Sequence, residues 1–272
     1  MFSSIRKALS LMSYPIVWMA GIYLGLIILA MFAARSFFGM FTGAQVGFSL
    51  FLLFPLAIGG VLGILRYDDY SPILFLMQAK KHYFGIVIPA GICVLVIVIT
   101  MTLLMVPLSL IVGDIDQIMV SGLCGVSIPV IVATMFYAPV IVYEDATVTH
   151  SLLRSITLVI YDMISALKFW AVAMLLLFVV FFSTSMVWAG LAYEHLEQYA
   201  HLSVAEQQII YSAFTGEEWM AMLGDGLFFL VLFVSLCVAV VTTFLLCYVF
   251  VCYTEVRKSV PAPSAFQNGK IG

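Results

Sequence analysis

Six long apolar runs with no charge near their middle dominate this sequence. They cover residues 14–34, 46–65, 84–112, 118–143, 165–193 and 226–253. A helix needs about 20 apolar residues to cross the hydrocarbon core of a membrane, and each run reaches that length. Hydrophobic residues make up 64% of the chain and charged residues only 9%, too few to coat a protein surface in water. The sequence therefore predicts an all-α fold, an integral membrane six-helix bundle.

The loops between these spans differ sharply in charge. Of the 11 basic residues, all but Arg35 lie on one side of the expected membrane: Arg6, Lys7, Arg66, Lys80, Lys81, Arg154, Lys168, Arg257, Lys258 and Lys270. Because Lys and Arg mark the cytoplasmic side, we expect both termini in the cytoplasm. The acidic residues of the long loop 194–225 then face outward.

Spans 1, 3 and 5 each follow a short amphipathic segment. In the first, Phe2, Ile5 and Leu9 recur at helical spacing beside Arg6 and Lys7. The second begins at residues 71–72, where serine is a good helix cap and proline suits the first turn. The third covers residues 148–160. We expect three cytoplasmic interfacial helices, with the acidic residues 68–69 and 144–145 capping the helix that follows each pair.

The long outer loop has the most distinctive local pattern. Ser203-x-x-Glu206 and Thr215-x-x-Glu218 are capping boxes, and they predict two short helices that carry apolar side chains. These side chains form a candidate partner-docking surface, or alternatively a lid over the helix ends: Ile209, Ile210, Phe214, Trp219 and Met222.

Two further groups suggest weaker sites. Basic residues on the cytoplasmic side suit the headgroups of anionic lipids: Lys80, Lys81, Arg154, Arg257 and Lys258. Glu194, Glu197 and His201 share a helical face that a divalent metal would fit, but acidic faces with a stray histidine are common. We therefore predict no metal and no cofactor.

Residues 136–145, Phe-Tyr-Ala-Pro-Val-Ile-Val-Tyr-Glu-Asp, are followed at 151–158 by an amphipathic Ser-x-x-Leu type segment. This pattern resembles uncharacterised prokaryotic, especially archaeal, polytopic membrane proteins related to the membrane domain of glycerophosphoryl diester phosphodiesterases. The resemblance supports the fold. It implies no activity, because the separate catalytic barrel of those phosphodiesterases has no counterpart in this chain.

The spans lack the charged or histidine groups of proton-coupled carriers and haem proteins, and the sequence holds no nucleotide loop or hydrolase motif. We expect a single transmembrane domain over residues 1–258 and a disordered cytoplasmic tail over 259–272.

The leading hypothesis is a non-catalytic scaffold or accessory subunit in a prokaryotic cell (inner) membrane. Its partners would be membrane lipids and other membrane proteins, not nucleic acid. A transporter for a lipid-like or weakly polar solute is the alternative. A lipid-acting enzyme, which needs Asp68, Asp69, Glu144 and Asp145 to converge, ranks last.

Overall fold

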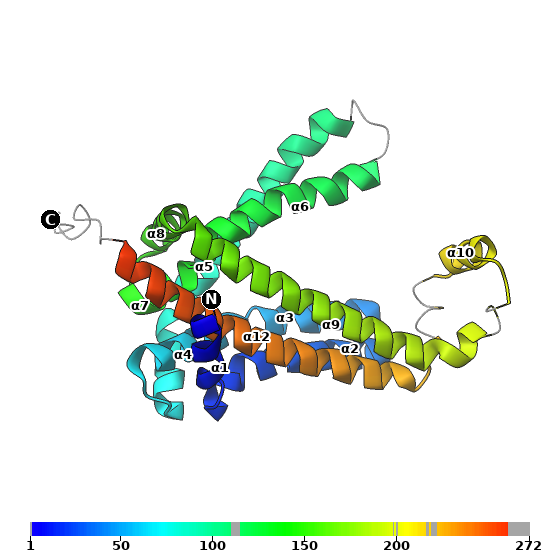
Figure 1. Cartoon of the computed structure of the whole chain (residues 1–272), viewed down its shortest axis with the longest axis horizontal. Coiled ribbons are helices and arrows are strands. Elements are labelled where there is room, and N and C mark those ends of the chain that lie inside the picture. The colour runs from blue at the N-terminus through cyan, green and yellow to red at the C-terminus, as the bar shows by residue number, and fades with distance from the viewer. Residues whose placement is uncertain are drawn as a thin grey trace. The chain divides into compact units, whose positions relative to one another are not determined.

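The computed structural model describes residues 2–109, 115–197, 199, 201–215, 218 and 222–260. Almost all of the described residues are helical, and none of them forms a strand. Within this described part of the chain, six stretches are long and apolar enough to cross a membrane: Pro15–Phe38, Met40–Tyr67, Pro72–Leu104, Gly125–Glu144, Met163–Tyr193 and Gly226–Ser259. The predicted all-α membrane bundle with six spans is therefore confirmed, and Figure 1 follows its helices along the chain.

Two of the spans are each built from two helices. Span 2 consists of α3 (Met40–Phe51) and α4 (Phe54–Tyr67), and span 4 of α6 (Ile115–Thr134) and α7 (Tyr137–Glu144). The proline ring clashes with the carbonyl four residues earlier. For Pro55 that residue is Phe51, where α3 ends, and for Pro139 it is Met135, which follows α6. Both breaks thus coincide with a proline clash, although α5 and α6 continue through Pro89, Pro107 and Pro129.

The remaining spans are continuous helices. Span 1 is a 3₁₀ turn, η1 (Pro15–Trp18), that leads into α2 (Met19–Phe38). Span 3 lies in α5 (Pro72–Ser109), span 5 in α9 (Met163–Glu197) and span 6 in α12 (Gly226–Ser259). α5, α9 and α12 have 38, 35 and 34 residues, well past the length a membrane requires, so their ends reach the headgroup region or beyond.

The three predicted amphipathic segments differ in outcome. α1 (Phe2–Leu11) and α8 (Val148–Tyr161) are separate helices, as expected. The segment before span 3 is not separate, because α5 runs from Pro72 through the whole span. No proline or glycine between residues 73 and 84 interrupts the helix. The start of α5 is as predicted, since the Ser71 hydroxyl accepts the backbone N–H of Leu74 at 3.3 Å.

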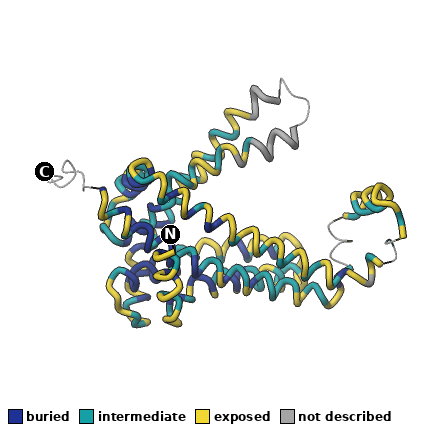
Figure 2. The backbone as a smooth tube through the Cα atoms, viewed as in Figure 1, coloured by how far each residue is buried: buried dark blue, intermediate teal, exposed yellow. Residues whose placement is uncertain are grey.

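The chain divides into two compact units, which we describe separately. Unit 1 comprises Met1–Ala20, Leu52–Val172 and Thr243–Gly272, and unit 2 comprises Gly21–Phe51 and Ala173–Thr242. The largest fully buried side chains all belong to unit 1, Tyr248, Tyr253 and Phe136 among them. Figure 2 shows that buried residues gather in this part of the chain.

Close helix contacts in unit 1 depend on glycine. A Cβ at Gly60 would lie 2.5 Å from the Phe75 ring, and one at Gly63 would lie 2.3 Å from the Gln78 side chain. Small residues let transmembrane helices approach closely, so α4 and α5 pack tightly here. Beside this contact, Leu62, Ile86 and Ile141 form the buried centre of the unit.

Candidate functional site

Two helices of unit 1 end in the same unusual way. α4 stops at Asp68 and α7 at Asp145, and both caps adopt the left-handed conformation, with φ of 53° and 50°. Aspartate is one of the few residues other than glycine that tolerates this geometry. The similar sequences at residues 66–70 and 143–146 therefore produce the same local backbone, and each places a carboxylate just past its helix.

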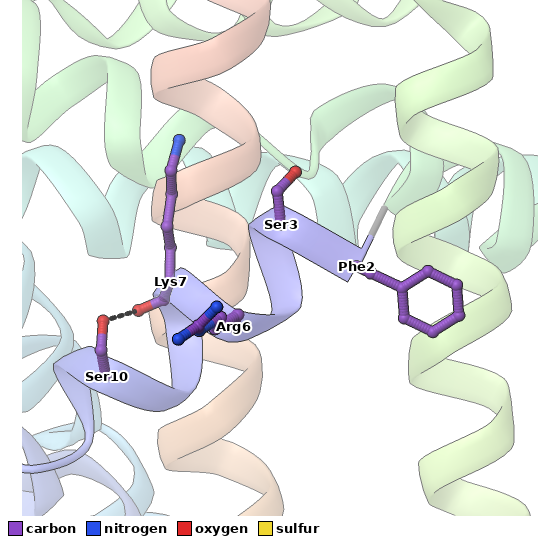
Figure 3. A pocket seen from close by; sticks show the side chains of 5 residues that line it. All are labelled: Phe2, Ser3, Arg6, Lys7 and Ser10. Carbon is purple, nitrogen blue, oxygen red and sulfur yellow. Dashed lines mark hydrogen bonds between the residues drawn. The ribbon is translucent and has the colours of Figure 1, made fainter.

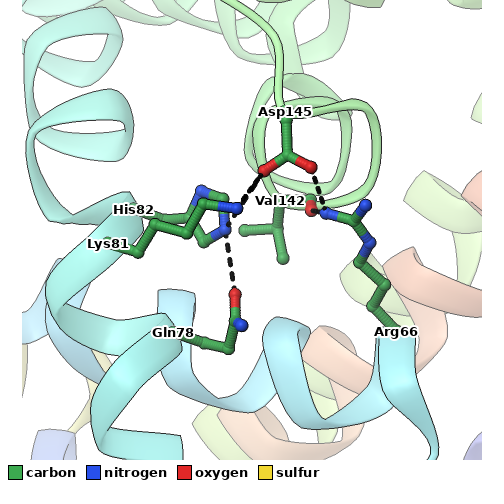
Figure 4. Close-up of polar contacts among 6 residues, drawn as sticks. All are labelled: Arg66, Gln78, Lys81, His82, Val142 and Asp145. Carbon is green, nitrogen blue, oxygen red and sulfur yellow. Dashed lines mark hydrogen bonds and ion pairs between the residues drawn. The ribbon is translucent and has the colours of Figure 1, made fainter. Parts of the chain in front are cut away.

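Asp145 lies between two cations from different helices (Figure 4). Arg66 of α4 donates to Asp145 Oδ2 at 2.7 Å and to the carbonyl of Val142 at 2.5 Å. Lys81 of α5 donates to Oδ1 at 2.5 Å. His82 Nε2 stands 3.8 Å from the same Oδ1, and it contacts Gln78 Oε1 at 3.1 Å. Asp145 therefore joins α4, α5 and α7 at one point.

Glu144 gathers a second set of partners from α8 and α12. The Tyr253 hydroxyl donates to Glu144 Oε1 at 2.9 Å. Arg257 Nε and Arg154 Nε lie 3.4 and 3.7 Å from that oxygen, and His150 Nε2 lies 3.9 Å from Oε2. Only 16% of the Glu144 side chain and 3% of the Arg154 side chain are exposed. This carboxylate therefore joins α7 to α8 and α12.

The Tyr143 ring lies near one arginine from each of these two sets of contacts. The guanidinium carbon of Arg257 lies 4.5 Å from the ring centroid, and that of Arg66 lies 5.9 Å away, within the range of cation–π attraction. We call the whole set the charged cluster: Arg66, Lys81, His82, Tyr143, Glu144, Asp145, His150, Arg154, Tyr253 and Arg257.

The electrostatics of the charged cluster favour an ionised Asp145. Burial alone would raise the pKa of Asp145, but hydrogen bonds from Lys81 and Arg66 outweigh it and lower the pKa below its ordinary value of 3.8. A general acid at neutral pH needs a raised pKa. The arrangement of Asp145 therefore suits a clasp that holds helix ends together.

The acidic pair at the end of α4 has different contacts. Asp69 accepts the backbone N–H of Ser71 at 3.1 Å, and Asp68 accepts the Tyr70 hydroxyl at 3.0 Å. The Tyr70 ring stacks on Tyr14 with centroids 3.6 Å apart, and burial together with Asp68 raises the pKa of Tyr70. Of the two residues expected to cap the next helix, Asp69 thus bonds to the backbone of Ser71 at its start, whereas Asp68 bonds to the Tyr70 side chain.

The predicted capping role of Glu144 and Asp145 is wrong. The N-cap of α8 is Thr147, and it makes no side-chain cap hydrogen bond. Both acidic side chains point to cations instead. Sequence reasoning could not find this, because Arg66 and Asp145 are 79 residues apart and Glu144 and Tyr253 are 109 apart.

The predicted headgroup residues fall into two classes. Lys81, Arg154 and Arg257 belong to the charged cluster and contact its carboxylates. Lys80 and Lys258 are exposed, and no carboxylate among the described residues forms an ion pair with either. These two lysines stay available for headgroups.

The amino-terminal helix α1 attaches to the end of α12. Ser4 donates to Glu255 Oε2 at 2.9 Å, and Lys7 Nζ lies 3.3 Å from Oε1. Ser4 and Ala8 form the buried face of α1, which leaves Phe2 83% and Leu9 54% exposed. Figure 3 shows Phe2, Arg6 and Lys7 projecting from the helix. With Ser3 and Ser10 they line a hollow of about 490 Å³. An interfacial membrane helix exposes this combination of side chains.

The outer loop in unit 2 is folded locally. α10 (Val204–Ala213) begins with the full predicted capping box between Ser203 and Glu206, and the same reciprocal bonds join Thr215 and Glu218. These hydrogen bonds lower the pKa of both glutamates. The two predicted caps are therefore confirmed.

The candidate docking residues of this loop have mixed exposure. Ile209 is 70% exposed, whereas Ile210 and Met222 are half-buried. Phe214 packs against the rings of Tyr199 and Tyr211, with centroids 6.3 Å apart in each case. Trp219 lies outside the described residues, as does the predicted tail beyond residue 260. Among the side chains that the structure describes, no group of three His, Cys, Asp or Glu residues could hold a metal ion. The side chain of Glu194, part of the face considered for a metal, lies outside this described set.

Comparisons with protein-family models, with curated proteins and with solved structures find no match to this chain. The resemblance of residues 136–160 to the phosphodiesterase-related membrane proteins therefore stays a prediction.

Proposed function

We propose that this membrane protein is a non-catalytic accessory or scaffold subunit that packs a transmembrane helix of a partner against α5. The observation that carries the proposal is an exposed stripe along span 3. Its spacing of four, three, four and three residues is that of helix–helix seams. We call it the α5 seam, and it comprises Phe84, Ile88, Gly91, Leu95 and Val98.

The α5 seam is open along its length. Phe84, Leu95 and Val98 are 69%, 57% and 55% exposed. Only 11% of the apolar stretch of α5 is buried, the lowest share among the six spans of the described residues. The opposite face holds the fully buried Ile86. One face of α5 thus belongs to the core of unit 1, and the other is available to lipid or to another helix.

Gly91 places a small residue at the centre of this exposed face. A Cβ at Gly91 would meet nothing within 4 Å, whereas neighbouring side chains occupy the space beside Gly60 and Gly63. Interfaces between transmembrane helices are enriched in small residues, because these let two backbones come close. A glycine at the centre of an exposed seam has no packing role within unit 1, and we assign its role to a partner helix.

The charged cluster supports this role by fixing the base of α5. Lys81 lies on the same helix as the seam and bonds to Asp145 at 2.5 Å. A docking surface is most useful on an element held rigidly by its neighbours. The salt bridges and the close α4–α5 packing provide that support.

We also infer that the charged cluster lies at the cytoplasmic face of a prokaryotic plasma membrane. Its arginines and lysine come from the loops that carry nearly all the basic residues, which is the usual mark of the inner side. α1 and the end of α12 meet through Ser4 and Glu255, so both terminal helices share that face.

A transporter for a lipid-like solute remains the alternative. It predicts hydroxyl side chains along a path, but Thr102, Thr134 and Ser185 donate to carbonyls four residues earlier in their own helices. These bonds satisfy the hydroxyls locally and favour a structural role for them.

Site-specific photo-crosslinking in native membranes tests the proposal. A photoreactive phenylalanine analogue replaces Leu95 in the α5 seam, and the matched control replaces Leu175 of α9, which is 62% exposed. We expect one discrete protein adduct from position 95 and only lipid adducts from position 175. Adding Gly91→Leu should remove the protein adduct without changing thermal stability, because the new side chain enters open space. Lipid adducts alone at position 95 would refute the proposal.

A further inference from the structure

An apolar groove lies in unit 2 between α2, α3 and the start of α12. Its volume is about 540 Å³, within the range of about 300–1,000 Å³ that is typical of small-molecule sites. Met31, Leu227 and Val231 contribute to its walls, and Arg35 is the one charged residue in its lining. A groove of this kind accepts a hydrocarbon chain that ends in a charged group.

The groove is built by a close helix pair. α2 and α3 are joined at Gly39, whose φ of 91° suits glycine. A Cβ at Gly43 would lie 2.9 Å from that of Arg35, and one at Gly47 would lie 2.3 Å from Met31 Sδ. The Gly-x-x-x-Gly pair thus lets α3 approach the outer half of α2. The same contact positions Arg35 and Met31 beside the groove.

Arg35 has an unusual electrostatic setting. It lies in the last turn of α2, where the helix dipole favours a cation, and it is the one basic residue on its expected side of the membrane. No carboxylate of the described residues forms an ion pair with it. The nearby Ser36 hydroxyl donates to the Phe32 carbonyl at 2.9 Å. A guanidinium at a membrane edge reaches toward the interface, where lipid phosphates are the abundant anions.

We infer that this groove binds one anionic phospholipid of the surrounding leaflet. The Arg35 guanidinium holds the phosphate, because its planar donors match two phosphate oxygens. An anionic lipid suits this site better than a zwitterionic one, since no headgroup cation offsets its charge or competes with Arg35 for the phosphate. One acyl chain of the lipid lies along Met31, Leu227 and Val231. This inference concerns unit 2 alone and does not depend on the α5 seam or on any protein partner.

Native mass spectrometry of the purified full-length protein tests the assignment. The protein is stripped of lipid by detergent exchange and titrated with phosphatidylglycerol or with zwitterionic phosphatidylcholine. We expect one tightly bound phosphatidylglycerol. Arg35→Gln should weaken that binding by about tenfold, the effect of losing a charge-assisted hydrogen bond, and Arg35→Lys should retain part of it. Lys168→Gln, which removes the same charge from an exposed residue of unit 1, should leave it unchanged.

Ala44→Phe provides a second variant, because Ala44 lines the groove and a larger side chain fills it while Arg35 remains. We expect this change to weaken phosphatidylglycerol binding as well. Equal binding of both lipids, or equal binding by the wild type and Arg35→Gln, would show only annular lipid and would overturn the inference. A dimer that forms through the groove and excludes lipid would overturn it too. If Ala44→Phe does not fold, the comparison of the wild type with Arg35→Gln and Arg35→Lys decides the outcome.

Discussion

Asp145→Asn tests whether the charged cluster holds the ends of the helices together. Asparagine has the same shape as aspartate and also tolerates the left-handed backbone of this cap. The substitution therefore removes charge and little else. It weakens the contacts of Asp145 with Arg66 at 2.7 Å and Lys81 at 2.5 Å, so we expect α4, α5 and α7 to lose part of their mutual attachment.

The structure sets the size of the effect. A hydrogen bond to a charged group is worth roughly 1.5–3 kcal/mol, and an exposed ion pair about 0.2–1 kcal/mol. Asp145 is 42% exposed, Lys81 51% and Arg66 21%. Solvent screening at this exposure brings the expected loss for the pair of contacts down to about 1–2 kcal/mol in the free energy of unfolding.

Asp68→Asn is the matched control. Asp68 caps α4 in the same left-handed conformation, but its side chain accepts from the Tyr70 hydroxyl, and no cation of the described residues pairs with it. Thermal and denaturant unfolding in mild detergent would compare the variants. We expect Asp68→Asn to change stability by less than about 0.5 kcal/mol. Equal losses of unfolding free energy from the two substitutions would refute the role of Asp145 in holding the helix ends together.

The pH dependence supplies an independent check. The pKa of Asp145 in the folded protein is lowered from 3.8, so its stabilising contribution is fully present above that pH. It is lost as the pH falls through the lowered folded-state pKa. The stability gap between the wild type and Asp145→Asn should therefore be constant near neutral pH and shrink below about pH 4. A gap that grows on acidification would contradict the assignment.

Three further substitutions test other parts of the fold. Glu144→Gln should cost about 3 kcal/mol, more than Asp145→Asn, because it removes a nearly buried carboxylate that accepts from Tyr253; unfolding in mild detergent measures it. Gly60→Leu should prevent stable folding, since its Cβ would lie 2.5 Å from the Phe75 ring; a monodisperse, fully stable variant would contradict this packing. Ser203→Ala should destabilise α10 locally by about 1 kcal/mol, seen as faster amide hydrogen exchange confined to that helix.

The features predictable from the sequence are those set by local chemistry. Span length follows from the number of apolar residues, and the Ser203 cap follows from a four-residue pattern. Each of these depends on residues close together in the chain, so a single sequence is enough to find them.

Local sequence patterns could not predict the charged cluster. The sequence places Glu144 and Asp145 just after a span, where helix capping is the nearest explanation. Which cations face them depends on how α4, α5, α8 and α12 pack, and that packing is set by buried residues such as Ile86 and by glycine contacts such as Gly60. The attachment of α1 is equally remote, since Ser4 and Glu255 are 251 residues apart.

The most direct test of the proposed role is the intact mass of the protein released from native membranes in mild detergent. The account predicts a complex in which a second membrane protein is present in a fixed ratio. The same preparation of Gly91→Leu should lack that protein while the chain itself stays folded. A wild-type chain that is always released alone, with the same stability and mass as the variant, would contradict the assignment of an accessory or scaffold subunit.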